Sequence, residues 1–267
     1  MDRDTLLAAG DRNLAEVLRL AARTAPDGFV EDDGRLLLVS SSRRWPGPYH
    51  NGAIRLDSSM RPTDVLDRAR EFFASRCSGY CIWIAAHADA DLDAAAAGAG
   101  LALLSDKGTP RMAALDIDSS AEVPEGVSLD EVTNEKDRED FLGVTVEAYK
   151  EAPLPIDAAR AQLSCIEALR GPRVRAVIAR DHGVPVAAAM VVVSDGVAGV
   201  QMVGTIPSAR RRGLAELCTR WVSDTGRELG ATAVVLEASE AGEPVYKRMG
   251  FVEISRYRWY LGPPAMR

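Results

Sequence analysis

Three apolar segments follow one another between residues 174 and 206, with at most three residues between neighbours. They read VRAVIAR, VPVAAAMVVVS and GVAGVQMVGTI. Asp181-His182-Gly183 and Asp195-Gly196 separate them, and these residue types favour the backbone of tight hairpin turns. The pattern predicts three consecutive strands, so we expect an antiparallel sheet in this part of the chain.

Regular elements are expected along the rest of the chain as well. Apolar residues at helical spacing predict helices at 3–24, 62–76, from after residue 86 to about residue 97, 135–152, 157–170, 212–229 and 240–250. Short β-branched or aromatic runs predict strands at 35–42, 50–57, 80–86, 127–132, 232–239 and 251–262, with two more within 100–117. Pro62 marks the start of the second helix, with Thr63 or Asp64 as its cap. This mixture predicts an α/β (α+β) fold.

A polar segment, DSSAEVPEG at 118–126, divides the chain. Its composition, with Pro124 and Gly126, is typical of a linker. A chain of 267 residues is long enough for one large or two modest domains. We therefore expect one domain at residues 1–122 and a second at residues 123–267.

Composition and charge narrow the classes of function. Apolar residues make up 47% of the chain, and the net charge of −7 argues against a general nucleic-acid role. We expect no signal peptide, because Met1-Asp2-Arg3-Asp4 lacks a basic start followed by an apolar core, and no apolar run reaches the ~20 residues that cross a bilayer. The cysteines lack paired CxxC spacing, which argues against zinc and disulfides and favours reduced thiols in a cytoplasm. They are Cys77, Cys81, Cys165 and Cys218.

One polar cluster contains residue types that bind metals: His87, Asp89 and Asp91. Because the cluster lies between a strand and a helix, helix capping explains the aspartates, and no metal is expected. The other histidines, His50 and His182, lie in turns without identifiable partners.

The two halves of the chain end with the same order of elements. YCIWIAA (80–86) leads through a polar turn and a helix to Gly100-Leu101 and a strand. TAVVLEAS (232–239) leads in the same way to Gly250-Phe251 and a strand. We interpret this as a divergent internal repeat. The alternative is chance recurrence of a common strand–helix–strand unit.

Three arginines, Arg210 to Arg212, precede Gly213 where a helix is expected to begin. A helix N-terminus carries unpaired N–H groups and partial positive charge, so phosphate is its natural occupant. Gly213 has no Cβ and Ala215 is small, so a ligand can approach closely. Arginine adds charge and paired donors suited to phosphate oxygens. The alternative, a solvated basic helix start, would oppose the helix dipole.

RRRGLA, Arg210 to Ala215, resembles the R/Q-x-x-G-x-G/A signature of the GNAT N-acetyltransferase superfamily. It stands between a strand and a helix, as in that family. PVYKRMGF (244–251) resembles the family's last helix and strand, where a tyrosine precedes a Gly-Phe pair. The order of elements from 127 to 262 resembles the whole fold. The resemblance therefore implies two tandem GNAT-like domains, each a mixed, mainly antiparallel sheet flanked by helices.

The N-terminal domain resembles a degenerate copy of the same fold. At the corresponding helix start, RPTDVL (61–66) has neither the glycine nor the small residue of the signature. Asp64 would also place negative charge where a pyrophosphate should lie. We expect acetyl-CoA to bind to residues 123–267 and not, with useful affinity, to residues 1–122.

The resemblance implies transfer of an acetyl group from acetyl-CoA, as co-substrate, to an amine. The pantetheine arm would insert where strands 196–206 and 232–239 splay apart, and would pair with the first strand. One backbone N–H near the thioester would stabilise the oxyanion, and Gly204 is expected to mark a bulge there. Ser239 would contact CoA, cap the following helix, or both. The other residues assigned to cofactor binding are Met202, Val203, Gly204 and Thr205 around the thioester, and Arg210, Arg211, Arg212, Gly213, Leu214 and Ala215 around the pyrophosphate.

Tyr246 matches the family's tyrosine that protonates the departing thiolate; a core tyrosine is the alternative. The acceptor amine, with a pKa of ~10.4, must lose a proton before it attacks. The family often takes a glutamate from the strand before the arginine loop, but that strand offers only Gln201, which cannot act as a base. Glu237, on the same strand face as Ser239, and Glu147, near a helix end, are the candidate bases through water. Each also fits a surface charge.

The sequence leaves the acceptor open between a small-molecule amine and a peptide amine. The acyl donor is open between acetyl-CoA and relatives such as propionyl- or succinyl-CoA. A second hypothesis is an acyl-CoA-binding sensor without turnover, with the N-terminal half as a partner-binding module. The missing strand glutamate favours the sensor, and Tyr246 argues against it. No nucleic-acid or membrane partner is expected, and both a monomer and a homodimer are compatible with the sequence.

Overall fold

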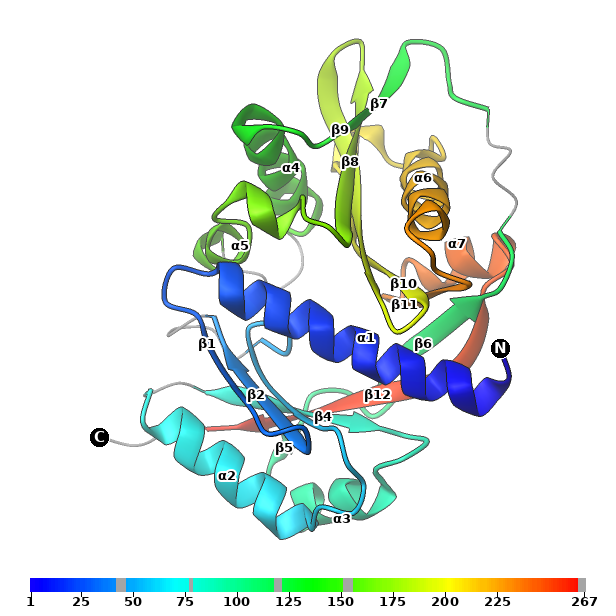
Figure 1. The fold of residues 1–267 in the computed structure, drawn as a ribbon. Coiled ribbons are helices and arrows are strands. Elements are labelled where there is room, and N and C mark those ends of the chain that lie inside the picture. Colours follow the sequence, from blue (N-terminus) through cyan, green and yellow to red (C-terminus); the bar gives the residue numbers. More distant parts are fainter. Residues whose placement is uncertain (42–46, 77–78, 118–121, 151–155, 264–267) are drawn as a thin grey trace.

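The computed structural model describes residues 1–41, 47–76, 79–117, 122–150 and 156–263. The N-terminal half (residues 1–122) begins with a long helix and continues with short strands and two more helices (Figure 1). Its elements are α1 (Arg3–Thr24), β1 (Phe29–Asp32), β2 (Leu36–Ser40), β3 (Asn51–Arg55), α2 (Pro62–Ala74), β4 (Tyr80–Ala85), α3 (Ala90–Gly98), β5 (Ala102–Leu103) and β6 (Thr109–Ala114). Helix α1 begins at a side-chain cap, because the carboxylate of Asp2 accepts a hydrogen bond from the Thr5 backbone N–H at 2.9 Å.

The C-terminal half (residues 123–267) contains the long hairpins that the sequence predicts. Its elements are β7 (Val127–Glu131), α4 (Glu135–Ala148), α5 (Ile156–Gln162), η1 (Ile166–Ala168), β8 (Val174–Asp181), β9 (Val184–Ser194), β10 (Val197–Thr205), η2 (Pro207–Ala209), α6 (Leu214–Glu228), β11 (Ala233–Glu237), α7 (Glu243–Arg248) and β12 (Val252–Gly262). The loops His182-Gly183 and Asp195-Gly196 have positive φ at both residues, which matches the twist of the strands they join. The predicted antiparallel order of β8, β9 and β10 is confirmed.

The described strands form one twelve-stranded sheet whose order alternates between the halves. The order is β1-β2-β3-β4-β12-β6-β11-β10-β9-β8-β7, with β5 pairing to β12. Strand β6 of the N-terminal half thus lies between β11 and β12, and β12 lies between β4 and β6. Each half supplies a strand to the other. The division at residues 122 and 123 stays a prediction, and the hydrogen bonds of the sheet cross it.

Each half repeats the same order: three strands, a helix, a parallel strand, a second helix and closing strands. Strand β3 pairs parallel with β4 over Gly52–Ile54, and β10 pairs parallel with β11 over Val197–Gly199. The remaining ladders of the described sheet are antiparallel. The prediction of a mixed, mainly antiparallel sheet flanked by helices is therefore confirmed.

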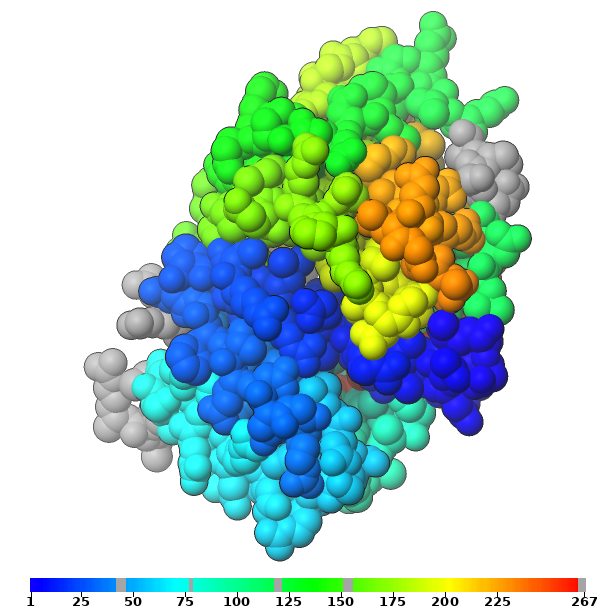
Figure 2. Space-filling view, viewed as in Figure 1, coloured from blue at the N-terminus to red at the C-terminus, as the bar shows by residue number. Residues whose placement is uncertain are grey.

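Helix α1 packs between the two halves and forms hydrogen bonds with the C-terminal half. Asn13 of α1 is buried and its Nδ2 donates to the carbonyl oxygen of Val192 at 2.9 Å and to Ser194 Oγ at 3.1 Å. A Cβ on Gly199 of β10 would lie 1.9 Å from Asn13 Oδ1, so only glycine permits this approach. In Figure 2 the blue residues of α1 lie between the cyan elements of the N-terminal half and the green and yellow ones of the C-terminal half. The halves form one packed body.

The predicted helices and strands agree with the structure in kind, and two details differ. Helix α2 has Arg61 as its N-cap, so neither Thr63 nor Asp64 caps it: both lie inside the first turn. Helix α5 ends at Gln162, and two residues later Ser164 Oγ donates to the Thr24 carbonyl at 2.6 Å.

No helix among the described residues is both long and apolar enough to cross a membrane. Cys77 and residues 118–121 of the expected linker lie outside the described residues.

Candidate active site

Strands β10 and β11 part after three residues of parallel pairing, and a cavity opens beside their C-terminal ends. On its other edge, β11 stays paired with β6 from Val234 to Glu237, so that Glu237 lies opposite Arg111. The cavity holds about 640 Å³, within the ~300–1,000 Å³ typical of small-molecule sites. Elements of both halves line it, including α1, residues 47–50, α4, α5, β10 and α7. The cavity therefore lies between the two halves and opens at the gap between β10 and β11.

A bulge distorts β10 at this gap. The register with β9 shifts between Gln201 and Gly204, and Met202 has a φ of 51°, a left-handed conformation that costs ~1–3 kcal/mol in a non-glycine residue. Tyr149, which ends α4, donates from its hydroxyl to the Val203 carbonyl at 2.8 Å. A Cβ on Gly204 would lie 2.9 Å from the Ala148 Cβ, so glycine lets α4 approach. The bulge expected at Gly204 is confirmed.

The arginine loop ends in an uncapped helix start. Arg211 and Gly213 have φ values of 66° and 77°, and no side chain caps α6. Within the described residues, the backbone N–H groups of residues 211–216 make no hydrogen bond. A Cβ at Gly213 would meet nothing within 4 Å, so the surface there is open. This contrasts with α1 and α4, where Asp2 and Asn134 accept from the first turn.

Two of the three arginines bind the protein itself. Arg212 pairs with Asp181 at 2.5 Å, at the end of β8. Arg210 donates through Nη2 to the Ala148 carbonyl at 3.1 Å and so ties the loop to α4. Arg211 is exposed at the surface. The loop is thus held from two sides while its N–H groups face outward.

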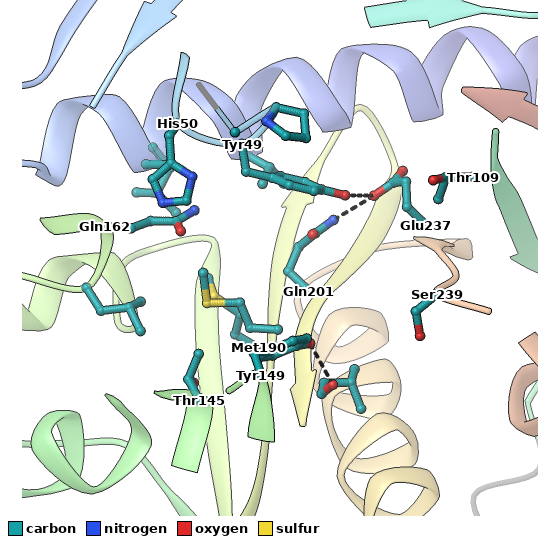
Figure 3. Close-up of a pocket in the computed structure, with 18 of the residues that line it drawn as sticks. Tyr49, His50, Thr109, Thr145, Tyr149, Gln162, Met190, Gln201, Glu237 and Ser239 are labelled. Carbon is teal, nitrogen blue, oxygen red and sulfur yellow. Dashed lines mark hydrogen bonds between the residues drawn. The ribbon is translucent and has the colours of Figure 1, made fainter. Parts of the chain in front are cut away.

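Glu237 is the one charged side chain among the described residues that line the cavity. It is 3% exposed, and its Oε1 accepts from Arg111 Nη1. Its Oε2 accepts from Gln201 Nε2 at 3.1 Å and from the Tyr49 hydroxyl at 3.5 Å (Figure 3). Gln201, which cannot act as a base, instead holds the carboxylate from across the gap.

Tyr246 and Ser239 also line the cavity, on the α7 side. Tyr246 is 8% exposed, and its ring packs edge-on against Phe251. Burial, and then the nearby Tyr149, raise the pKa of Tyr246, so it carries its proton at neutral pH. Ser239 Oγ accepts from the Gly242 N–H at 3.1 Å in the turn before α7. The N-cap of α7 is Gly242 and no side chain caps the helix, so the alternative that Ser239 is its N-cap is wrong.

Glu147, the other candidate base, lies at the protein surface and not at the cavity. Its side chain is 48% exposed and pairs with Lys150 at 2.6 Å. It is absent from the described residues that line the cavity. It turns outward because α4 directs Thr145 and Tyr149 to the cavity side instead.

The sequence model of the acetyltransferase (GNAT) family matches residues 134–251, which include β8 to β11, the bulge and the arginine loop. Residues 134–251 are a GNAT acetyltransferase domain. The match confirms the resemblance seen in RRRGLA and PVYKRMGF.

Solved structures extend the likeness to the whole chain. A GCN5-related N-acetyltransferase from Kribbella flavida is 23% identical, with 96% of each chain covered and a TM-score of 0.72. A tandem GNAT protein from the clavulanic acid biosynthesis pathway is 16% identical, covers 100% of this chain and 98% of its own, and has a TM-score of 0.62. None of the curated proteins compared with this chain matches it. The tandem GNAT fold is confirmed.

In the N-terminal half of this tandem GNAT fold, an ion cluster lies at the equivalent ends of β3 and β4, on the wall of a second cavity of about 450 Å³. Arg55 ends β3 with its side chain 1% exposed, and its Nη2 lies 2.7 Å from Asp89 and 2.6 Å from Asp91. At the start of α2, Pro62 lacks an N–H, and Arg61 pairs with Asp64 at 2.8 Å. Both features support the prediction that this half does not bind CoA.

The same cluster corrects the interpretation of the aspartates as caps. Asp89 stands at the N-cap position of α3, but its carboxylate binds Arg55 and the Ala85 N–H and not the helix. His87 contacts Asp11 at 2.9 Å and Ser255 at 2.8 Å. Among the described residues, no group of three His, Cys, Asp or Glu side chains is placed to hold a metal.

Sequence reasoning missed four side chains around the GNAT cavity. Tyr49, His50 and Gln162 line it, and Arg111 supports Glu237 from behind. The sequence predicts only a turn at His50 and a strand at Arg111, without a functional signal at either. The roles of Tyr49, His50 and Arg111 depend on residues 47–50 and β6 reaching the C-terminal half, which no local pattern indicates.

Proposed function

We propose that this protein is an N-acetyltransferase that moves an acetyl group from acetyl-CoA to a primary amine held in the cavity between its halves. The observation that carries the proposal is the gap between β10 and β11 inside the GNAT domain. That gap has a bulge on one side, and Glu237, Ser239 and Tyr246 on the other.

The residues present fit acetyl-CoA as co-substrate. The unpaired N–H groups of residues 211–216 and the positive end of α6 suit a pyrophosphate. Gly213 leaves room for its oxygens, and Arg211 is free to approach from the surface. The backbone of Met202 to Thr205 borders the gap and suits a thioester. When bound, acetyl-CoA supplies the activated acetyl group.

Two side chains move the protons. Glu237 accepts the proton that the amine loses as its nitrogen bonds to the acetyl carbon. Tyr246 donates its proton to the sulfur as the carbon–sulfur bond breaks. A backbone N–H of the bulge holds the charge that develops on the carbonyl oxygen, a contact typically worth ~3 kcal/mol. Gln201 and Arg111 keep the Glu237 carboxylate in place.

The test is thiol release from acetyl-CoA with a panel of primary amines, together with the mass of the acetylated product. Transfer that disappears in Glu237→Gln, while calorimetry shows unchanged acetyl-CoA binding, is the expected result. Turnover in Glu237→Gln with an unchanged pH–rate profile would remove Glu237 from the mechanism. Tight acetyl-CoA binding without transfer to any amine would favour the sensor hypothesis, which the absence of a glutamate at Gln201 supports.

A further inference from the structure

The end of the cavity away from Ser239 lies between the halves and is largely apolar. Helix α1 covers it, and β10 and α5 form the opposite walls (Figure 3). The apolar residues that line it include Val17, Leu20, Ala21, Leu163, Ala168 and Met190. A ligand seated here gains affinity by burying apolar surface.

Two polar side chains, His50 and Gln162, interrupt this apolar lining. His50 is 3% exposed, and within the described residues its Nε2 is buried without a hydrogen-bond partner. Gln162, 6% exposed, lies beside it and also faces the cavity (Figure 3). Burial lowers the pKa of His50 to about 4, so the imidazole is neutral and can donate or accept.

The backbone holds His50 in this position. Its N–H donates to the Gly47 carbonyl at 2.9 Å, and its carbonyl accepts from the Ser41 N–H at 2.7 Å. An unpartnered buried polar atom destabilises the empty site by ~1–3 kcal/mol. A ligand that hydrogen-bonds to Nε2 removes this penalty.

The charge of the cavity limits what binds. Glu237 is the only charged side chain among its described lining residues, and Arg111 already balances it. One amine can lie beside Glu237 and lose its proton there. A second ammonium group would be taken out of water without a counter-charge, which is strongly unfavourable.

We infer that the acceptor is a monoamine with an apolar body and one uncharged hydrogen-bonding group at its far end. The amine lies beside Glu237, the body lies under α1, and the far group bonds to His50 and Gln162. This inference rests on the proposed acetyltransferase function and names the substrate class of the same site. It assigns His50, a residue of the N-terminal half, as a specificity determinant.

The experiment compares four amines in the full-length protein with acetyl-CoA: 2-phenylethylamine, tyramine, spermidine and kanamycin. Tyramine is expected to exceed 2-phenylethylamine about tenfold in kcat/KM, because its hydroxyl is the uncharged far group that the inference assigns to His50. Spermidine and kanamycin are expected to be at least a hundredfold poorer than tyramine. Higher kcat/KM for either polycation than for both monoamines would overturn the inference and leave the acetyltransferase function standing.

The variant His50→Leu separates a specificity role from a structural one. It is expected to bring the tyramine to 2-phenylethylamine ratio close to one while 2-phenylethylamine turnover persists. Gln162→Leu is expected to reduce the ratio in part, and His182→Leu, at an 80% exposed side chain, to leave it unchanged. An unchanged ratio in His50→Leu would overturn the inference.

Calorimetry with tyramine in the presence of CoA gives a readout that does not need turnover. Binding that weakens about tenfold in His50→Leu supports the inference even where no amine is acetylated, and in that case only the proposed function fails. Absence of tyramine binding to the CoA-loaded protein would overturn the inference.

Discussion

Arg111 and Glu237 lie directly opposite each other on adjacent strands of different halves, and their side chains are only 0% and 3% exposed. Arg111 comes from β6 of the N-terminal half, and Glu237 ends β11 of the GNAT domain. Arg111 Nη1 also donates to the Tyr257 hydroxyl at 3.0 Å, and that hydroxyl donates to Asp11 on α1. The N-terminal half therefore supplies the counter-charge for the only charged group that the described cavity wall contains.

Removing this counter-charge should destabilise the fold. We expect Arg111→Met to lower the free energy of unfolding by about 3–5 kcal/mol, because the buried charge of Glu237 then has no counter-charge. Urea unfolding followed by circular dichroism measures the change. The double variant Arg111→Met/Glu237→Gln should regain most of the loss, since no buried charge remains. Arg258→Met is the matched control: its pair with Asp93 is partly exposed, and a loss below about 1 kcal/mol is expected. Equal losses at both arginines would contradict the prediction.

Local patterns predict the elements of this protein well, because hairpin turns, helix starts and apolar spacing are properties of short segments. RRRGLA also indicates the loop before α6, since a glycine at positive φ and an uncapped helix start are local features. The exchange of β6 and β12 between the halves is different. It depends on which strand edge each segment meets, and the sequences of both strands fit either neighbour.

The exchange of strands determines which residues form the site. It places Arg111 next to Glu237 on the neighbouring strand, and residues of the N-terminal half, His50 and Tyr49, line the cavity. Glu147 shows the opposite case: its position on α4 fitted a wall of the acceptor site, but the helix faces the cavity with Thr145. Thr145 and Glu147 are two residues apart and therefore point to nearly opposite sides of the helix. The apolar residues of α4 do not mark one face clearly enough to predict which side meets the cavity.

The proton donor gives a kinetic prediction. Tyr246→Phe should lower kcat about a hundredfold, because general-acid catalysis typically contributes ~10²–10⁴-fold. Burial raises the pKa of Tyr246, so the hydroxyl keeps its proton and no loss of activity below pH 10 should come from its ionisation. Thiol-release assays at saturating acetyl-CoA measure kcat. Tyr80→Phe is the control, because Tyr80 is also buried but stacks on Phe73 outside the cavity. A change below threefold in Tyr246→Phe would show that another group protonates the thiolate.

An acid at the start of α6 should affect stability and CoA binding in opposite directions. Ala215→Asp places negative charge in the first turn, which should stabilise the helix by about 0.3–1 kcal/mol. The same charge should weaken CoA binding at least tenfold, because it repels the pyrophosphate. Thermal unfolding without ligand and calorimetry with CoA give the two values. Ala94→Asp, on the exposed face of α3, makes the same change in net charge and should leave CoA affinity unchanged.

CoA should bind once per chain. The carboxylates of Asp89 and Asp91 bind Arg55 at the end of β3 and place negative charge there, and the Arg61–Asp64 pair lies at the start of α2. Calorimetry on the full-length protein should give a stoichiometry of one, and Ala215→Asp should weaken that single site. The full chain is needed because β12 forms part of the N-terminal half's sheet. A second site of micromolar affinity that survives in Ala215→Asp would contradict the assignment of the N-terminal half as degenerate.

His50 should make the stability of the folded protein depend on pH. Its pKa is about 4 in the folded protein and near 6.5 in the unfolded chain, because burial disfavours the charged imidazole. Above pH 6.5 both states hold it neutral, and the full stability is present. As the pH falls from 6.5 towards 4, the unfolded chain takes up a proton that the folded protein does not. Stability is therefore lost over this window, by roughly 3 kcal/mol in all and roughly 2 kcal/mol by pH 5.

The variant His50→Gln isolates this contribution, because all carboxylates are common to the two proteins and cancel in the difference. Urea unfolding at pH 7.5, 6 and 5 should show the wild type losing about 2 kcal/mol more than His50→Gln between the first and last values. A ligand that bonds to Nε2 should deepen the difference, since it binds the neutral imidazole of the folded protein. Parallel pH profiles for the two proteins would mean that His50 reaches solvent and charges freely, which is incompatible with its place at the buried end of the cavity.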